Sequence, residues 1–172
     1  MSNAVLITGF NNWGKTTIIY DLFKRKQFRE GHKYVINGVN SSFVVESHSN
    51  DDVAASKYIP MLKSKFGNLI CNQHDLLAAF CPTREIKNDS KDILNDLFFK
   101  QFNNIYILYL ENKWDYHAKL QIKEIMNHYA GINNVNHVVI NADNGGRGSA
   151  NDVQRNTLRV KQIKNELMKI FP

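Results

Sequence analysis

The sequence lacks the features that mark several large classes of protein. It holds only two cysteines, Cys71 and Cys81, which are too few for a disulfide framework and are expected to be small buried residues in a reducing compartment. Its Cys/His spacing does not resemble that of a zinc site. No apolar run approaches the ~20 residues of a membrane-spanning helix. The polar N-terminus leads straight into a predicted strand, which is not the pattern of a signal peptide. We therefore expect a cytoplasmic protein without a membrane span.

One stretch carries most of the chemical information. Residues 9–16 read Gly-Phe-Asn-Asn-Trp-Gly-Lys-Thr and fit the pattern G-x-x-x-x-G-K-[ST]. They follow an apolar run at 4–7, which predicts a buried strand, and they precede apolar residues at helical spacing from 16 to 23. A glycine loop between a strand and a helix directs backbone N–H groups into a concave anion site, and the start of the helix adds partial positive charge. The stretch therefore predicts a phosphate-binding loop.

The loop pattern also assigns roles to its residues. Lys15 is expected to reach the β- and γ-phosphates as the catalytic residue, and the Thr16 hydroxyl to ligate Mg²⁺. The backbone around these two residues should cradle phosphate: Asn12, Trp13, Gly14, Lys15, Thr16 and Thr17. The pattern resembles that of the P-loop NTPase superfamily. This resemblance implies a three-layer α/β fold, a magnesium-bound GTP or ATP as ligand, and phosphoryl transfer or hydrolysis.

The periodicity of the remaining chain predicts an α/β fold in one domain, residues 1–172. Strand-like runs at 33–38 and 42–46 are too close for a crossover helix and should form an antiparallel hairpin. Later strands should alternate with helices, which favours a mostly parallel sheet. These strands are predicted at 76–81, 105–110 and 137–140, and the helices at 53–66, 91–101, 116–129 and 152–170. Residues 69–71 could extend the first of these strands or form a short edge strand.

Three residues bear on the ends and faces of these helices. Pro60 should kink or end the helix at 53–66. Ser90 can cap the helix at 91–101, which has Leu97 on its apolar face.

Two short motifs after later strands resemble those of Ras-like GTPases. Asn112-Lys113-x-Asp115 is similar to the guanine-specificity motif N-K-x-D. The resemblance implies that Asp115 accepts two hydrogen bonds from guanine, that Lys113 packs over the base, and that Asn112 ties this loop to the phosphate loop. The turn at 141–143 resembles S-A-K, which implies that the backbone N–H at Ala142 contacts the guanine oxygen.

The chain departs from the Ras-like pattern in two places. It has no threonine between Thr17 and Thr83, so the switch threonine is missing, and residues 46–49 read Glu-Ser-His-Ser where D-x-x-G is expected. Glu46, Asp51 or Asp52 could instead serve the metal through water. The match therefore favours nucleotide binding over hydrolysis or switching, and a degenerate binder with little turnover stays open beside a GTPase-like hydrolase or switch.

A P-loop kinase of small molecules or nucleotides is the rival interpretation. Arg147, Arg155 and Arg159 could clamp a transferring phosphate, or they could lie on the solvent face of the last helix. Asp75 could act as a metal-linked acid or as a base. Residues 143–146 also fit D-x-x-G, in an order that keeps an ATPase with another sheet order open.

Charge gives the last indication about partners. The net charge of +6 suits a polyphosphate binder. The basic run Lys24-Arg25-Lys26 with Arg29 is either a solvated helix end or a patch for nucleic acid or an acidic partner. We expect no nucleic-acid partner and leave a protein partner open.

Overall fold

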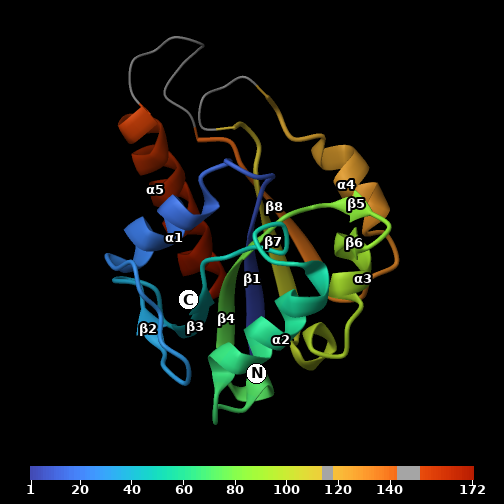
Figure 1. The fold of residues 1–172 in the computed structure, drawn as a ribbon. Coiled ribbons are helices and arrows are strands. Elements are labelled where there is room, and N and C mark those ends of the chain that lie inside the picture. Colours follow the sequence, from blue (N-terminus) through green and yellow to red (C-terminus); the bar gives the residue numbers. More distant parts are fainter. Residues whose placement is uncertain (114–117, 143–151) are drawn as a thin grey trace.

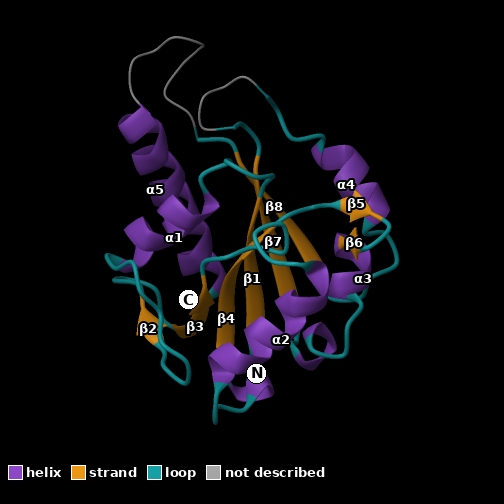
Figure 2. Cartoon of the chain, in the orientation of Figure 1, coloured by secondary structure: helices purple, strands orange, loops and turns teal. Residues whose placement is uncertain are grey.

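The computed structural model describes residues 1–113, 118–142 and 152–172 and has helices on both faces of a mostly parallel sheet (Figure 2). In spatial order the six strands of this sheet are β2 (Tyr34–Val35), β3 (Ser42–Glu46), β4 (Asp75–Phe80), β1 (Asn3–Thr8), β7 (Asn104–Leu110) and β8 (Val135–Ile140). Neighbouring strands pair in parallel except β2 and β3, which are antiparallel. The predicted α/β class, parallel sheet and hairpin are confirmed.

The helices divide between the two faces of the sheet (Figure 1). On one face α1 (Lys15–Phe23) lies beside α5 (Asp152–Ile170). The other face carries α2 (Ala55–Phe66), α3 (Ser90–Leu94) and α4 (Ile122–His128). This division follows from right-handed crossovers: the chain moves from β1 outward to β3, and then returns past β1 to β8 in the opposite direction. A separate two-stranded hairpin, β5 (Arg84–Glu85) and β6 (Asn88–Asp89), precedes α3.

The centre of the sheet forms the core because its strands are apolar on both faces. Ala4 to Ile7 of β1 have no solvent exposure, nor do Leu76 to Phe80 of β4. Leu6 pairs with Ala78 on one side and with Ile107 on the other. Parallel pairing brings the carboxyl ends of these strands to one edge of the sheet, where the loops after β1, β3 and β7 can meet.

Two expectations about the segment before β4 are wrong: a strand at 69–71, and a helix that ends at Pro60. Residues 69–71 form no strand, and Cys71–Gln73 is a short 3₁₀ turn. Pro60 does not end its helix, since α2 runs on to Phe66 and is capped by Gly67. The proline ring faces solvent, whereas Tyr58, Leu62 and Phe66 on the opposite side are buried, and this burial holds the helix together across the proline.

The helix predicted at 91–101 is much shorter in the structure. Asp89, and not Ser90, is the N-cap of α3, and its carboxylate accepts from the N–H of Lys91. The Asp96 carboxylate accepts from the N–H of Phe98, a local bond that competes with helix propagation. Consequently α3 ends at Leu94, and a 3₁₀ turn forms at 99–101. Leu97, placed on the apolar face by its spacing, is 75% exposed.

The last third of the chain follows the prediction more closely. The last strand and the last helix occur where expected, as β8 and α5. α4 begins only at Ile122, because residues 118–120 bond back to 111–113: the N–H of Lys113 donates to Ala118, and that of Leu120 to Glu111. In the described ranges no helix has the length and apolar character needed to cross a membrane.

Candidate functional site

The predicted phosphate loop joins the carboxyl end of β1 to the start of α1. Gly9 needs to lack a side chain, because a Cβ there would lie 2.7 Å from the Trp13 ring. Gly14 is the N-cap of α1 with φ +88, a conformation that favours glycine. Trp13 is only 5% exposed, and its indole Nε1–H donates to the Leu110 carbonyl at 2.8 Å. The tryptophan therefore fastens the loop to the end of β7, a role beyond the backbone contact expected from the sequence.

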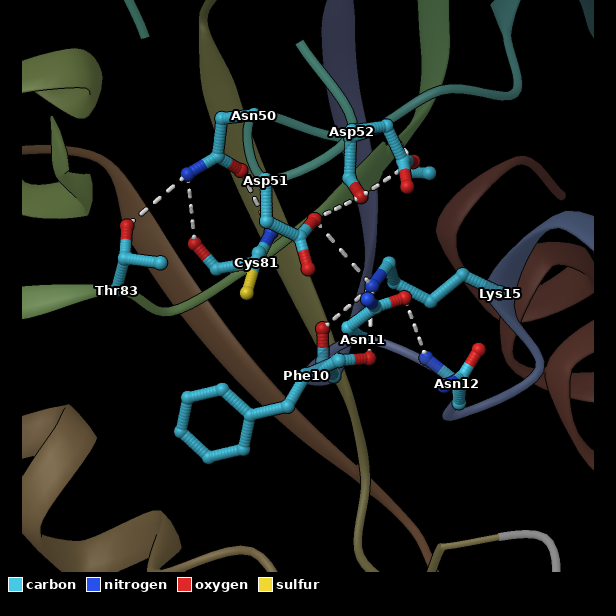
Figure 3. A network of polar contacts seen from close by, with 12 residues as sticks. Phe10, Asn11, Asn12, Lys15, Asn50, Asp51, Asp52, Cys81 and Thr83 are labelled. Atoms are coloured by element: carbon cyan, nitrogen blue, oxygen red, sulfur yellow. Dashed lines mark hydrogen bonds and ion pairs between the residues drawn. The ribbon is translucent and has the colours of Figure 1, made fainter. Parts of the chain in front are cut away.

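Lys15 lies at the centre of the site, folded back over the loop (Figure 3). Its ammonium donates to the carbonyls of Gly9 at 2.8 Å and Phe10 at 2.9 Å. It also lies 3.7 Å from the Asp51 carboxylate, and the residue is 5% exposed. A buried charge is tolerated when it is paired and hydrogen-bonded in this way.

The loop after β3, residues 47–52, forms the second wall of the site. The Thr16 hydroxyl donates to the Ser47 carbonyl at 2.9 Å, which joins this loop to α1. The Ser49 hydroxyl lies within hydrogen-bonding distance of both the Asp51 and the Asp52 carboxylate, and the Ser49 N–H donates to Asp52 at 2.8 Å. One Asp51 oxygen, Oδ2, is buried and accepts no hydrogen bond from the described residues. The two carboxylates are thus gathered beside Lys15 and Thr16.

Asn50 holds this loop in place, and sequence reasoning missed it. It is fully buried, its Oδ1 accepts from the Cys81 N–H at 2.7 Å, and its Nδ2 donates to the Cys81 carbonyl at 3.0 Å and to Thr83 Oγ1 at 3.1 Å (Figure 3). Asn88 adds a bond to the Asn50 carbonyl. These partners lie 31 to 38 residues along the chain, so a lone asparagine in a polar stretch gave no signal of them.

Cys81 is near these carboxylates, but its thiol is not poised to react. Burial raises the pKa of the Cys81 thiol far above its usual range, and the negative charge of Asp51 raises it further. The thiol therefore stays protonated at neutral pH and is a poor nucleophile.

Two other acidic candidates are held by partners other than Lys15. Glu46 is buried, accepts from the backbone N–H of His48 at 2.8 Å and lies 3.5 Å from the Lys65 ammonium. Asp75 begins β4 at the opposite edge of the sheet, where it accepts from the Asn3 N–H at 2.7 Å and from the Ser41 hydroxyl. These contacts give both carboxylates structural roles.

Arg159 of α5 joins the phosphate loop to the loop after β7. It is 4% exposed, so it does not lie on a solvent face. Its Nη1 donates to the Trp13 carbonyl at 3.2 Å and its Nη2 to the Asn112 carbonyl. Arg159 of α5 therefore connects the two loops that Asn112 was expected to connect, and the Asn112 backbone carbonyl is one of its acceptors.

The other residues expected to read a base are only partly placed. Lys113 borders the cleft beside the phosphate loop. The Ala142 N–H donates to Gln162 Oε1 at 2.6 Å, so this donor is engaged within the protein. Asp115, Asp143 and Arg147 lie outside the described residues, as does the side chain of Arg155.

A cleft of about 760 Å³ opens above the phosphate loop, a size typical of small-molecule sites. Its lining combines the loop and the start of α1 with residues from three other segments: Asn11, Asn12, Trp13, Gly14, Lys15, Thr16, Thr17, Asp21, Asp52, Lys113, Asn156 and Thr157. It lies at the carboxyl ends of the parallel strands, where ligands bind in open α/β sheets. The structure thus brings residues 11–17 and Lys113 to one cleft, and Gly9 and Phe10 of the predicted loop are not among its lining residues.

The donor groups around the cleft suit one metal ion in particular. Within the described parts of the chain, no three His, Cys, Asp or Glu side chains gather as a metal cluster. Mg²⁺ does not need such a cluster, since it keeps several waters and binds through one or two carboxylates and substrate phosphates. The Thr16 hydroxyl and the Asp51 and Asp52 carboxylates, with the buried Oδ2 of Asp51, fit that requirement.

Comparisons with known proteins add no family to this geometry. No protein-family model matches the chain, and neither a curated protein nor a solved structure matches it.

Proposed function

We propose that this chain is a P-loop protein that binds a magnesium nucleoside triphosphate in the cleft above residues 9–16. One observation carries the proposal: the Lys15 ammonium is held over the loop by the Gly9 and Phe10 carbonyls, at the start of a helix and at the mouth of a cleft. The backbone N–H groups at the start of α1 and this ammonium together attract a polyphosphate. This arrangement supports the roles that the loop pattern predicts.

Thr16, Asp51 and Asp52 are the residues that would hold Mg²⁺. When bound, the ion would neutralise charge on the phosphate oxygens. Asp51 would have a different partner before and after binding. In the structure its carboxylate pairs with Lys15. A phosphate that draws Lys15 away would leave the Asp51 carboxylate available to the metal.

We propose a GTPase-like hydrolase or switch as the activity, with guanine read by residues 112–115. The position of Lys113 at the border of the cleft supports a base at this end. The loop after β3, which lacks D-x-x-G, brings Asp51 and Asp52 close to the phosphate loop, so these two would replace the missing aspartate.

A phosphotransferase is the second candidate, and Asp51 is the observation in its favour. Its Oδ2 is buried without a normal hydrogen bond, beside a lysine that would hold phosphate. A carboxylate in that position could accept the proton of an attacking hydroxyl. The arginines expected to clamp a phosphate add no observation in its favour. Arg159 binds backbone carbonyls, and Arg147 lies outside the described residues.

Calorimetric titration with Mg-GTP and Mg-ATP side by side tests the proposal. Tight GTP with weak ATP supports the guanine assignment. Preference for ATP, or none, removes that assignment and makes the phosphotransferase the leading candidate. If neither nucleotide binds, the proposed function is wrong.

Turnover assays on the same preparation then separate the classes. Phosphate release from the preferred nucleotide above the buffer rate supports a hydrolase. Transfer to an added hydroxyl acceptor supports the phosphotransferase. Binding with neither product assigns the chain to nucleotide binders of little turnover.

A further inference from the structure

A second concentration of charge lies at the other end of α1. Residues 24–33, here called the basic segment, connect α1 to β2. The segment contains five of the chain's basic residues and one acidic residue, so it carries a net +4 of the total +6. α1 has nine residues, which places the segment roughly 13 Å from the phosphate loop. The charge of this segment therefore lies apart from the nucleotide cleft.

The backbone of the basic segment is anchored to the core. Phe28 is 9% exposed, and its ring packs against Phe23 at 5.5 Å and Tyr34 at 5.2 Å between centroids. The Lys65 ammonium donates to the Phe28 carbonyl at 2.8 Å, and the Arg29 N–H donates to the Tyr34 hydroxyl at 2.7 Å. An anchored segment presents its charged side chains with less ordering cost when a ligand binds.

The charged side chains surround a pocket of about 580 Å³. Its lining residues come from this segment and β2: Arg25, Lys26, Gln27, Arg29, His32 and Tyr34. The Arg25 guanidinium lies over the Tyr34 ring at 4.8 Å from its centroid, which orients the planar guanidinium. In the described part of the chain no carboxylate lines the pocket, and the Glu30 side chain packs near Gly67.

The cations of this pocket are not neutralised by the acidic side chains that the structure describes. Among the described residues, Arg25, Lys26 and Arg29 form no ion pair. Three unneutralised cations in one concave site give a local positive potential that attracts anions. Arginine and lysine side chains are the usual partners of phosphate oxygens.

We propose that this pocket is a second anion site, which binds a compact diphosphate or triphosphate independently of the phosphate loop. Each phosphate monoester carries about −1.5 to −2 charges at neutral pH, so two phosphate groups match three permanent cations. A nucleic-acid strand fits less well, because strand binding uses exposed aromatic rings for base stacking. The ring in this pocket, Tyr34, is 8% exposed and covered by Arg25.

Amide chemical shifts recorded during a titration with metal-free pyrophosphate test the proposal. At about 0.15 M salt, where exposed charges are screened beyond ~8 Å, we expect saturable shifts at residues 25–34. Arg25→Gln/Arg29→Gln should lower the affinity measured at those amides on the order of a hundredfold, since it removes two charge-assisted contacts. Shifts at residues 9–17 should be unchanged in this variant. Lys57→Gln/Lys123→Gln, at two exposed lysines elsewhere, is the charge-matched control and should bind like the wild type.

The same spectra distinguish this inference from the proposed function. Shifts confined to residues 9–17, or non-saturating shifts at 25–34, overturn the second site and leave the phosphate loop unaffected. Shifts confined to 25–34 support the second site and count against the phosphate loop. If a single-stranded oligonucleotide without a terminal phosphate binds at 25–34 more tightly than pyrophosphate, the assigned ligand class is wrong. If the double variant unfolds, Arg25→Lys tests the same site while keeping the charge. It should weaken pyrophosphate binding because the guanidinium stacked on Tyr34 is lost.

Discussion

At the residue scale, Lys15 is the group on which we expect the proposed nucleotide binding to depend. Replacement by alanine removes the ammonium that would contact phosphate while leaving the loop backbone in place. We expect Lys15→Ala to lower triphosphate affinity by about a hundredfold or more, the loss of two charge-assisted hydrogen bonds. Titration calorimetry measures this change, and circular dichroism checks the fold. Lys57→Ala, at an exposed lysine of α2, is the control. Unchanged affinity in a folded Lys15→Ala variant would contradict the site.

Replacing Asp51 should have opposite effects on triphosphate affinity without Mg²⁺ and on the gain in affinity that Mg²⁺ adds. Its carboxylate holds Lys15 at 3.7 Å, and we assign it to the metal once phosphate arrives. Asp51→Asn should therefore strengthen binding of metal-free triphosphate, because Lys15 is released, and should reduce the further gain in affinity on adding Mg²⁺. Titrations with and without Mg²⁺ measure both effects.

Asp52→Asn is the matched comparison for Asp51→Asn. Asp52 lies on the same loop and bonds to Ser49, but of the described acidic residues only Asp51 is paired with Lys15. Metal-free affinity should stay constant in Asp52→Asn. Equal behaviour of the two variants would refute the competition between Asp51 and phosphate.

At the element scale, the loops after β1 and β7 depend on α5 for their relative position. Arg159 donates to carbonyls on both loops, whereas a lysine ammonium lacks the planar fork needed to reach both in the same way. We expect Arg159→Lys to lower the free energy of unfolding by about 1–3 kcal/mol, the cost of unsatisfied buried acceptors. Urea denaturation measures it. Lys161→Arg, at an exposed position of α5, should have no comparable effect, and an equal loss in both variants would show that the bridge contributes nothing.

The contact between α3 and α4 gives a pH-dependent prediction. His128 Nε2 lies 2.7 Å from Asp89 Oδ1, and the Lys91 N–H also donates to that carboxylate. Burial alone would raise the pKa of Asp89, but these hydrogen bonds outweigh it and hold the pKa below its ordinary 3.8. Stability from this carboxylate is therefore fully present above pH 3.8 and is lost as pH falls through the folded-state pKa.

Urea unfolding of the wild type and Asp89→Asn, at about pH 6 and about pH 3, checks this expectation. The wild type should be the more stable at the higher pH, and its advantage should shrink at the lower pH. Asp92→Asn, at an exposed acid of α3, serves as the control. An advantage that does not change with pH would contradict the assigned pKa shift.

The elements also show where sequence patterns succeed and where they fail. β1 and β7 could be predicted because parallel strands buried on both faces are continuously apolar. The length of α3 could not, because Leu97 has helical spacing but the Asp96 carboxylate competes for the N–H of Phe98. Periodicity records burial over several residues, and a single side chain that competes for one backbone donor escapes it.

The same limit applies to the candidate site. The loop between β1 and α1 could be predicted because its residues are contiguous, and phosphate binding there stays a prediction. Asn50 and Arg159 could not, since their partners come from other elements and depend on the sheet order that brings those elements together. Of the residues expected to read guanine in the loop after β7, Asn112 and Lys113 are described, whereas Asp115 lies outside the described residues.

At the scale of the whole molecule, the two ends of the chain are joined through one core. The Phe171 ring packs against Phe43 of β3 at 5.2 Å between centroids, and the Pro172 carbonyl accepts from Asn40 at 2.8 Å. Ile163 and Leu167 of α5 have no solvent exposure. Because these contacts connect the last helix to the first strands, unfolding should involve residues 1–172 together.

Thermal unfolding should therefore occur in one transition, and nucleotide should raise its midpoint. A ligand at about 100 times its Kd that binds only the folded state adds about 2.7 kcal/mol. For a domain of this size that corresponds to an increase of roughly 5–10 °C. Scanning calorimetry with increasing Mg-GTP measures the increase, and Lys15→Ala should abolish it because that variant retains the core but loses the phosphate contact. Two transitions, only one of them moved by nucleotide, would instead divide the chain into two cooperative units. In that case the contacts of Phe171 and Pro172 would not couple α5 to the sheet.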